Sequence, residues 1–124
     1  MKITTFEPMI VTSKAEDAIS LFEALGFEKT HQPTTTTETG DVTSTRLKDA
    51  SGFHVDVADV PDMTQDMMLI RMNVDNFDEA YEILKKHGFT NTRGDGSIQT
   101  TSAKAATMVS PSGFRISLIE HFKK

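Results

Sequence analysis

The sequence repeats itself at half its length, and this repeat limits the possible folds more than any other feature. The segment Ala18–Thr30 (AISLFEALGFEKT) aligns with Ala80–Thr92 (AYEILKKHGFTNT), 62 positions further on (18 to 80). A second pair follows in the same order, Ser51–Val57 (SGFHVDV) and Ser112–Leu118 (SGFRISL), at an offset of 61 (51 to 112). Two matches in one order and at nearly one offset indicate a duplicated unit of about half the 124 residues.

Each copy is predicted to contain one amphipathic helix. Ser13 with Glu16, and Asn76 with Glu79, have the spacing of an N-terminal capping box in front of an apolar series. A glycine follows each series and can adopt the left-handed conformation that ends a helix. These glycines are Gly26 and Gly88.

One strand is expected before each helix and three after it. The expected strands are 6–11, 27–31, 42–47 and 53–58 in the first copy, and 68–74, 89–92, 103–109 and 114–119 in the second. The run Thr34–Thr37 is interpreted as an exposed hairpin arm. The sequence therefore predicts one α+β domain of two βαβββ modules, about 1–60 and about 67–124, joined by an Asp-rich linker.

Composition narrows the function classes. The chain has no cysteine, which excludes disulfides, thiolate metal sites and cysteine nucleophiles. Its net charge is −5 and it has no basic patch, so neither nucleic acid nor an anionic membrane surface is expected as a partner. No apolar run is long enough to span a bilayer, and the first residues lack the apolar core of a signal peptide. A cytoplasmic location is expected.

The paired motifs and their order resemble the vicinal oxygen chelate superfamily, which groups glyoxalase, bleomycin-resistance and extradiol-dioxygenase proteins. The matching stretches are Ala18–Phe27 (AISLFEALGF), Phe77–Phe89 (FDEAYEILKKHGF) and Ser110–Ile119 (SPSGFRISLI). The resemblance implies that the sheets of the two modules curve into a cup with the helices on its outer face. It also implies a homodimer.

Strand alternation separates the residues expected to face the helices from those expected to face a ligand. Phe53, Met68 and Phe114 lie on apolar faces and should pack on the helices. The mixed faces should line the cup, and the residues predicted there as ligand-binding are Glu7, His54, Asp56, Arg71, Asn73, Arg115 and Ser117.

In the superfamily, four His or Glu side chains from the first and last strand of each module hold a divalent metal in the cup. Carried onto this sequence, those positions are Glu7, Asp56, Leu69 and Ser117. Leu69 cannot ligate a metal, and a neutral serine hydroxyl is a poor ligand. No cofactor is therefore predicted. The alternative is weak binding of a hard divalent cation by the two carboxylates.

Arginine side chains offer another source of positive charge. Arg71 and Arg115 lie two residues from the two lost ligand positions, and we expect them to face Glu7 and Asp56 and to replace the metal's charge. Two other interpretations stay open at this point. Asp56 could form a purely structural ion pair with either arginine, and either arginine could bind an anionic group of a ligand.

Three functions of different class follow from the sequence. The first is a metal-free protein of the glyoxalase/bleomycin-resistance type that binds a small organic molecule in the cup or in a dimer groove. The second is a metal-dependent lyase or dioxygenase of the same superfamily. The third is a metal-free enzyme in which His54, Glu7 or Asp56 acts as base and an arginine stabilises an anion. The fold decides neither between them nor whether the chain is an enzyme, and the sequence does not identify the ligand.

Overall fold

The computed structural model describes residues 1–32, 34–37, 40–94, 96–99 and 101–122. The chain divides into two compact units, which are residues 7–68 and residues 69–124 together with 1–6. Each unit combines one helix with a sheet that contains parallel and antiparallel pairs. The α+β class and the two repeated modules predicted from the sequence are therefore confirmed.

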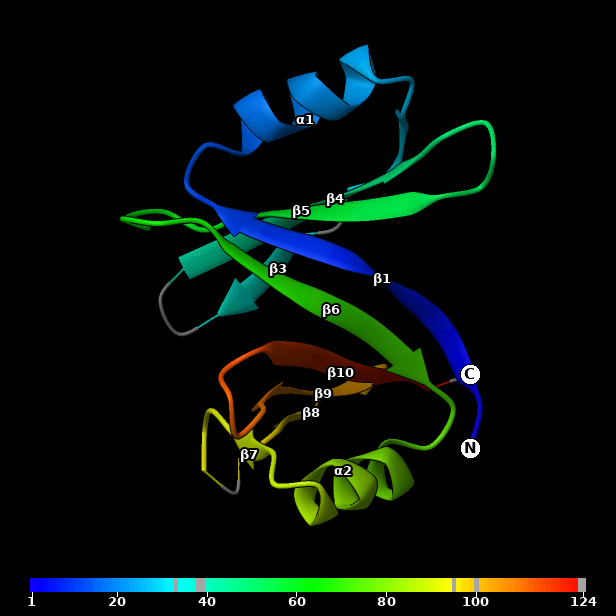
Figure 1. Ribbon diagram of the computed structural model, residues 1–124, viewed down its shortest axis with the longest axis vertical. Helices are drawn as coiled ribbons and strands as arrows, with labels where there is room; N and C mark the ends of the chain where they lie inside the picture. Colours follow the sequence, from blue (N-terminus) through cyan, green and yellow to red (C-terminus); the bar gives the residue numbers. More distant parts are fainter. Residues whose placement is uncertain (33, 38–39, 95, 100, 123–124) are drawn as a thin grey trace. The chain divides into compact units, whose positions relative to one another are not determined.

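In the unit of residues 7–68 one helix covers one face of a sheet (Figure 1). The strand order is β2-β4-β5-β1, with β3 paired to the first half of β4. β5 runs parallel to β1 and antiparallel to β4. The core between helix and sheet contains Ala15, Ile19, Leu47, Val55 and Val57. The elements are β1 (Ile3–Thr12), α1 (Ala15–Ala24), β2 (Glu28–His31), β3 (Thr34–Thr37), β4 (Gly40–Lys48) and β5 (His54–Asp59).

The second unit repeats this connectivity. Its strand order is β6-β10-β9-β7, β8 pairs with β9, and β10 runs parallel to β6 and antiparallel to β9. Its helix packs on a core of Met72, Val74, Phe77, Ala80, Ala106, Met108, Ile116 and Leu118. The elements are β6 (Met67–Val74), α2 (Phe77–Lys86), β7 (Thr90–Asn91), β8 (Ile98–Gln99), β9 (Ala103–Val109) and β10 (Arg115–His121). β8 is an addition to the strands predicted from the sequence.

Equivalent tight turns precede β5 and β10. In the first, the Asp49 carboxylate accepts hydrogen bonds from the backbone N–H groups of Ser51 and Phe53, at 3.0 and 2.8 Å. In the second, the Ser110 hydroxyl accepts from the N–H groups of Gly113 and Phe114, each at 3.0 Å. Different side chains therefore close the same turn in the two units, and each turn fixes the register of the strands that it joins.

The two helices begin differently, and one of the two predicted caps is wrong. Asn76 accepts a hydrogen bond from the N–H of Glu79 at 3.1 Å, as expected for an N-cap. Ser13 does not cap α1, because the Thr12 hydroxyl accepts from the N–H of Lys14 and the helix begins only at Ala15. The cap position falls on Lys14, whose side chain makes no capping hydrogen bond.

Three apolar residues expected to face the helices are instead exposed. Phe53 and Met68 each retain 69% of their accessible surface, and Phe114 is also exposed. Phe53 and Phe114 immediately precede β5 and β10, and Met68 is the second residue of β6, whereas each helix has only ten residues and covers about 15 Å. The alternation of the strands was therefore right, but the helices are too short to cover the ends of the apolar faces.

None of the helices in the described residues is long and apolar enough to cross a membrane.

The difference between the two helix starts is testable. Asn76→Ala should lower the free energy of unfolding by about 1 kcal/mol, because it leaves an N–H group at the start of α2 without its acceptor. Ser13→Ala should change it by less than about 0.5 kcal/mol, because Ser13 is not a cap and its hydroxyl, which donates to the Met63 carbonyl at 3.2 Å, is exposed to water. Urea titration followed by circular dichroism measures both, and equal losses in the two variants would contradict this assignment.

Candidate functional site

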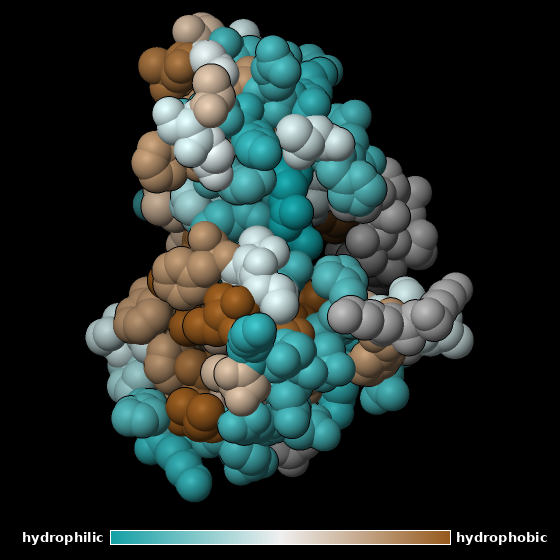
Figure 2. Space-filling view, turned by 90° about the vertical axis from the view of Figure 1, so that its right-hand side faces the viewer, coloured by the Kyte–Doolittle hydropathy of each residue, from teal (hydrophilic) through white to brown (hydrophobic). Residues whose placement is uncertain are grey.

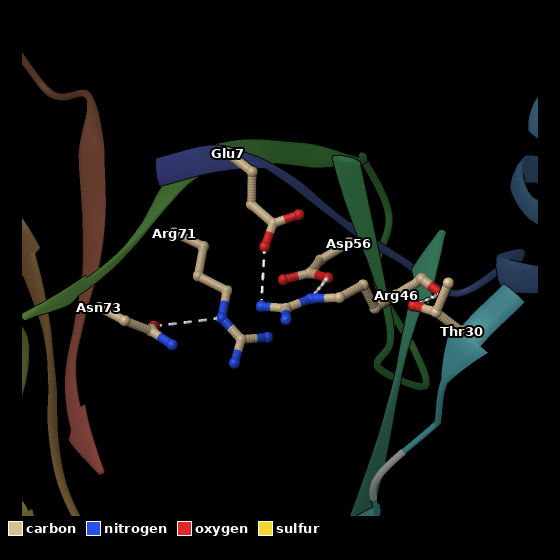
Figure 3. A network of polar contacts seen from close by, with 6 residues as sticks. All are labelled: Glu7, Thr30, Arg46, Asp56, Arg71 and Asn73. Carbon is tan, nitrogen blue, oxygen red and sulfur yellow. Dashed lines mark hydrogen bonds and ion pairs between the residues drawn. The ribbon is translucent and has the colours of Figure 1, made fainter. Parts of the chain in front are cut away.

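Two buried carboxylates and one arginine form a polar cluster in the unit of residues 7–68, here called the Arg46 cluster (Glu7, Arg46 and Asp56). The Nη2 group of Arg46 donates to Oε1 of Glu7 at 2.9 Å. Its Nε atom lies 3.6 Å from Oδ1 of Asp56, which makes an ion pair rather than a short hydrogen bond. Figure 3 shows the guanidinium group of Arg46 beside both carboxylates.

The pairing of three strands brings these residues together. Arg46 on β4 stands directly opposite Asp56 on β5. On the other side of β5, Asp56 is level with Met9 of β1, so Glu7, two residues earlier, lies on the same face of the sheet. The neighbouring residues Leu47, Val55 and Val57 point to the opposite face, where they pack under α1. Strand alternation thus sends the charged residues to the face that the helix does not cover.

Burial gives the positive charge of Arg46 a stabilising role in the cluster. Asp56 is 0% exposed and Glu7 is 4% exposed, whereas the Arg46 side chain retains 27% of its surface. An ionised carboxylate is stable away from water only when it has a charged or hydrogen-bonding partner. The planar guanidinium group can serve both carboxylates at once, which a lysine ammonium group does less well.

The predicted site residues of the other unit carry a different set of groups. Nε of Arg71 donates to Oδ1 of Asn73 at 3.3 Å, and Asn73 is buried. Ser117 lies opposite Arg71 on the neighbouring strand and is half-buried, as is Arg115. Leu69 is buried and offers no donor atom. That Arg71 and Arg115 neutralise Glu7 and Asp56 stays a prediction.

The structure brings together two of the residues expected in one site, Glu7 and Asp56, and adds one that sequence reasoning missed. Arg46 stands in a predicted strand, but its alternation alone does not show which residue it faces. Counting back from the turn at Ser51 and Gly52 would have placed it opposite Asp56. The same register places His54 of β5 opposite Lys48. His54 is half-buried.

The residues present do not fit the four-ligand metal site of the superfamily. Glu7 and Asp56 already contact the Arg46 cation, Leu69 has no ligand atom, and Ser117 offers only a neutral hydroxyl. Among the residues that the structure describes, no group of three or more His, Asp or Glu side chains could hold a metal ion.

Comparisons with known proteins identify the fold. No protein-family model matches the chain, and no curated protein matches it significantly. Among solved structures, methylmalonyl-CoA epimerase from Mycobacterium tuberculosis aligns with a TM-score of 0.71 and 14% identity, over 98% of this chain and 90% of that one. A glyoxalase/bleomycin resistance protein/dioxygenase superfamily member from Vibrio splendidus 12B01 aligns with a TM-score of 0.61 and 14% identity, over 96% and 99%.

A glyoxalase I variant from Zea mays also aligns, with a TM-score of 0.69 and 11% identity, over 98% of this chain and 44% of that one. The protein therefore has the vicinal oxygen chelate fold, as the repeated motifs predicted. Sequence identities this low carry the fold and leave the chemistry to be argued from this chain's own residues.

Removing one charge from the Arg46 cluster should cost stability. Glu7→Gln keeps the size of the side chain but removes its negative charge, so the ion pair with Arg46 becomes a hydrogen bond between a cation and a neutral amide. We expect a loss of about 1–3 kcal/mol in the free energy of unfolding, measured by urea titration. The matched control is Glu28→Gln on the exposed strand β2, which should cost less than about 0.5 kcal/mol. Equal losses in the two variants would show that the ion pair contributes nothing.

Proposed function

We propose that the protein binds a small organic molecule without a metal, in the manner of the metal-free members of the glyoxalase/bleomycin-resistance group. The observation that carries the proposal is the contact of Arg46 with Glu7 and Asp56. These carboxylates stand at two of the positions where the resemblance puts metal ligands, and a protein side chain already supplies their counter-charge. The other two positions, Leu69 and Ser117, lack the ligands that a transition metal requires.

The ligand is proposed to lie on the sheet faces that the helices leave uncovered. In the unit of residues 69–124, that face offers Arg71, Asn73, Arg115 and Ser117 as hydrogen-bonding groups beside apolar Leu69. Few polar groups among apolar ones are typical of small-molecule sites. The guanidinium groups favour a ligand with a carboxylate or another anionic group. The cytoplasmic location expected from the sequence is part of the same proposal.

A metal-free enzyme is the second candidate, and the burial of Glu7 favours it. Glu7 is 4% exposed and contacts Arg46, so a buried carboxylate that could act as base lies beside a positive charge that could stabilise an anion. His54 is the other candidate base, since its ordinary pKa lies near neutrality. A metal-dependent lyase or dioxygenase is the third candidate, and it requires ligands that the four positions do not supply.

Metal analysis and ligand screening test the leading proposal. The purified protein should contain far less than one transition metal ion per chain by inductively coupled plasma analysis. Ni²⁺, Zn²⁺ or Mn²⁺ should leave the melting temperature unchanged, whereas anionic organic molecules from a ligand screen should raise it by mass action. One tightly held transition metal per chain would overturn the proposal. Turnover of a hit compound that is lost in Glu7→Gln or His54→Ala, in metal-free buffer, would instead support the metal-free enzyme.

A homodimer is proposed as the assembled form. Each unit leaves large apolar side chains exposed to water, and such exposed apolar surface often marks an interaction site. These side chains are Phe53 and Met68 in one unit and Phe6 and Phe114 in the other. Figure 2 shows hydrophobic residues gathered at the surface on one face of the molecule. Association would remove such side chains from water.

Light scattering coupled to gel filtration tests the dimer. The protein should elute with about twice the mass of one chain, and Phe53→Asp should shift it toward the monomer because a charge would enter an apolar contact. The control is Glu23→Lys on the exposed side of α1, which should leave the mass unchanged. A monomer at micromolar concentration for the unaltered chain would refute the proposed dimer.

A further inference from the structure

A hollow of about 230 Å³ lies between α2 and β7, in the unit of residues 69–124. It is on the side of the sheet that the helix covers. Asn91 of β7 stands opposite Met108, which belongs to the core under α2, whereas Arg71 and Ser117 alternate with core residues and face the other way. The hollow, here called the Tyr81 pocket, is lined by Tyr81, Lys85, Phe89, Thr90, Asn91 and Gly94.

Two hydrogen-bond donors meet at the Tyr81 pocket. Tyr81 and Lys85 are four residues apart on α2 and therefore lie on the same side of the helix. The Lys85 Nζ atom is 5.6 Å from the centroid of the Tyr81 ring. The Asn91 amide donates to the Tyr81 hydroxyl oxygen at 3.4 Å, so the hydroxyl hydrogen is available to a different acceptor. An ammonium group and a hydroxyl group can thus serve one anionic acceptor.

The groups around the two donors are fixed by the fold. Asn91 is buried, and its side chain also donates to the Gly96 carbonyl at 2.7 Å and accepts from the Arg93 N–H at 3.0 Å. The segment after β7 therefore determines the position of the amide that contacts Tyr81. Phe89, the apolar wall of the pocket, packs against the core under α2. A site whose groups are already ordered loses less conformational freedom on binding.

The internal repeat shows which of these residues the fold itself requires. The apolar wall Phe89 corresponds to Phe27, so both units keep a phenylalanine there. The polar groups are not kept, because the residues equivalent to Tyr81, Lys85 and Asn91 are Ile19, Glu23 and Lys29. The first unit forms its helix and the corresponding strand pair with this other set. The hydroxyl, the amide and the positive charge of the second unit are therefore not demanded by the shared fold.

We propose that the Tyr81 pocket binds a small aromatic carboxylate, a ligand with one ring and one anionic group. The Lys85 ammonium and the Tyr81 hydroxyl donate to the carboxylate, and the ring of the ligand lies against Phe89. The volume of about 230 Å³ is below the roughly 300–1,000 Å³ of pockets for drug-sized ligands, which limits the occupant to one ring. Binding is weak because Lys85 is exposed to water.

The fluorescence of Tyr81 tests this site directly. The chain contains one tyrosine and no tryptophan, so its tyrosine emission comes from this pocket alone. Phenylacetate is the probe, because it absorbs little light where tyrosine is excited. We expect a saturable change in emission with a dissociation constant on the order of 10⁻³ M. Phenylacetamide, which has the same size and no charge, should bind at least about threefold more weakly. N-acetyltyrosinamide titrated in parallel corrects for collisional quenching.

A pair of lysine variants assigns the effect to one charge. Lys85→Gln should weaken phenylacetate binding at least about threefold and change phenylacetamide binding by less than about twofold. Lys86→Gln removes the same charge from the next residue of α2, which points about 100° away around the helix, and should leave phenylacetate binding within about twofold. Raising NaCl from about 0.02 to about 0.3 M should weaken phenylacetate binding to the unaltered protein more than to Lys85→Gln.

Heteronuclear NMR locates the probe without using tyrosine emission. Phenylacetate should shift the backbone N–H signals of Thr90, Asn91 and Gly94, which line the pocket. Tyr81→Phe keeps the ring and removes the hydroxyl, so the same shifts should require a higher phenylacetate concentration. Shifts confined to Arg71 and Ser117 would place the probe on the uncovered face and refute the Tyr81 pocket.

The inference goes beyond the proposed function, because the Tyr81 pocket shares no residue with the site proposed on the uncovered sheet faces. Emission that changes only linearly with phenylacetate, or equal affinities in the unaltered protein and Lys85→Gln, would overturn the inference and leave the proposed function standing. A ligand bound on the uncovered faces should be unaffected by Lys85→Gln. Saturable binding that Lys85→Gln weakens and Lys86→Gln does not supports the Tyr81 pocket.

Discussion

The burial of two carboxylates on one face of a small sheet is the strongest physical constraint on the candidate site. Glu7 and Asp56 lie almost entirely out of water, so a positive charge has to be present beside them. Arg46 contacts both carboxylates from β4, the neighbouring strand of β5. A carboxylate that contacts a guanidinium group is less available to a metal ion.

The fold was predictable from the sequence because its signals are local and occur twice. The helix series, the glycines that end the helices and the Ser-Gly-Phe turns each show in a short window, and the repeat confirms every one of them with a second example. Errors arose where a neighbouring element decides the outcome. Ser13 does not act as a cap because α1 begins only at Ala15, and Phe53 and Phe114 lie exposed beyond the short helices.

The candidate site was only partly predictable for a related reason. Strand alternation placed Glu7 and Asp56 on the correct face, but the residue that contacts them comes from another strand. Finding Arg46 requires the register between β4 and β5, which depends on the geometry of a turn. Sequence reasoning chose Arg71 and Arg115, because they stand near the lost ligand positions, and that choice stays a prediction.

The turn that precedes β5 has a consequence for how such sites can change. The Asp49 carboxylate holds the N–H groups of Ser51 and Phe53, and this fixes which β4 residue meets Asp56. Inserting or deleting one residue there would shift the pairing by one step, turning the guanidinium group toward the helix and an apolar side chain toward the acids. A surface turn thereby decides, through the strand register alone, which side chains meet on each face of the sheet.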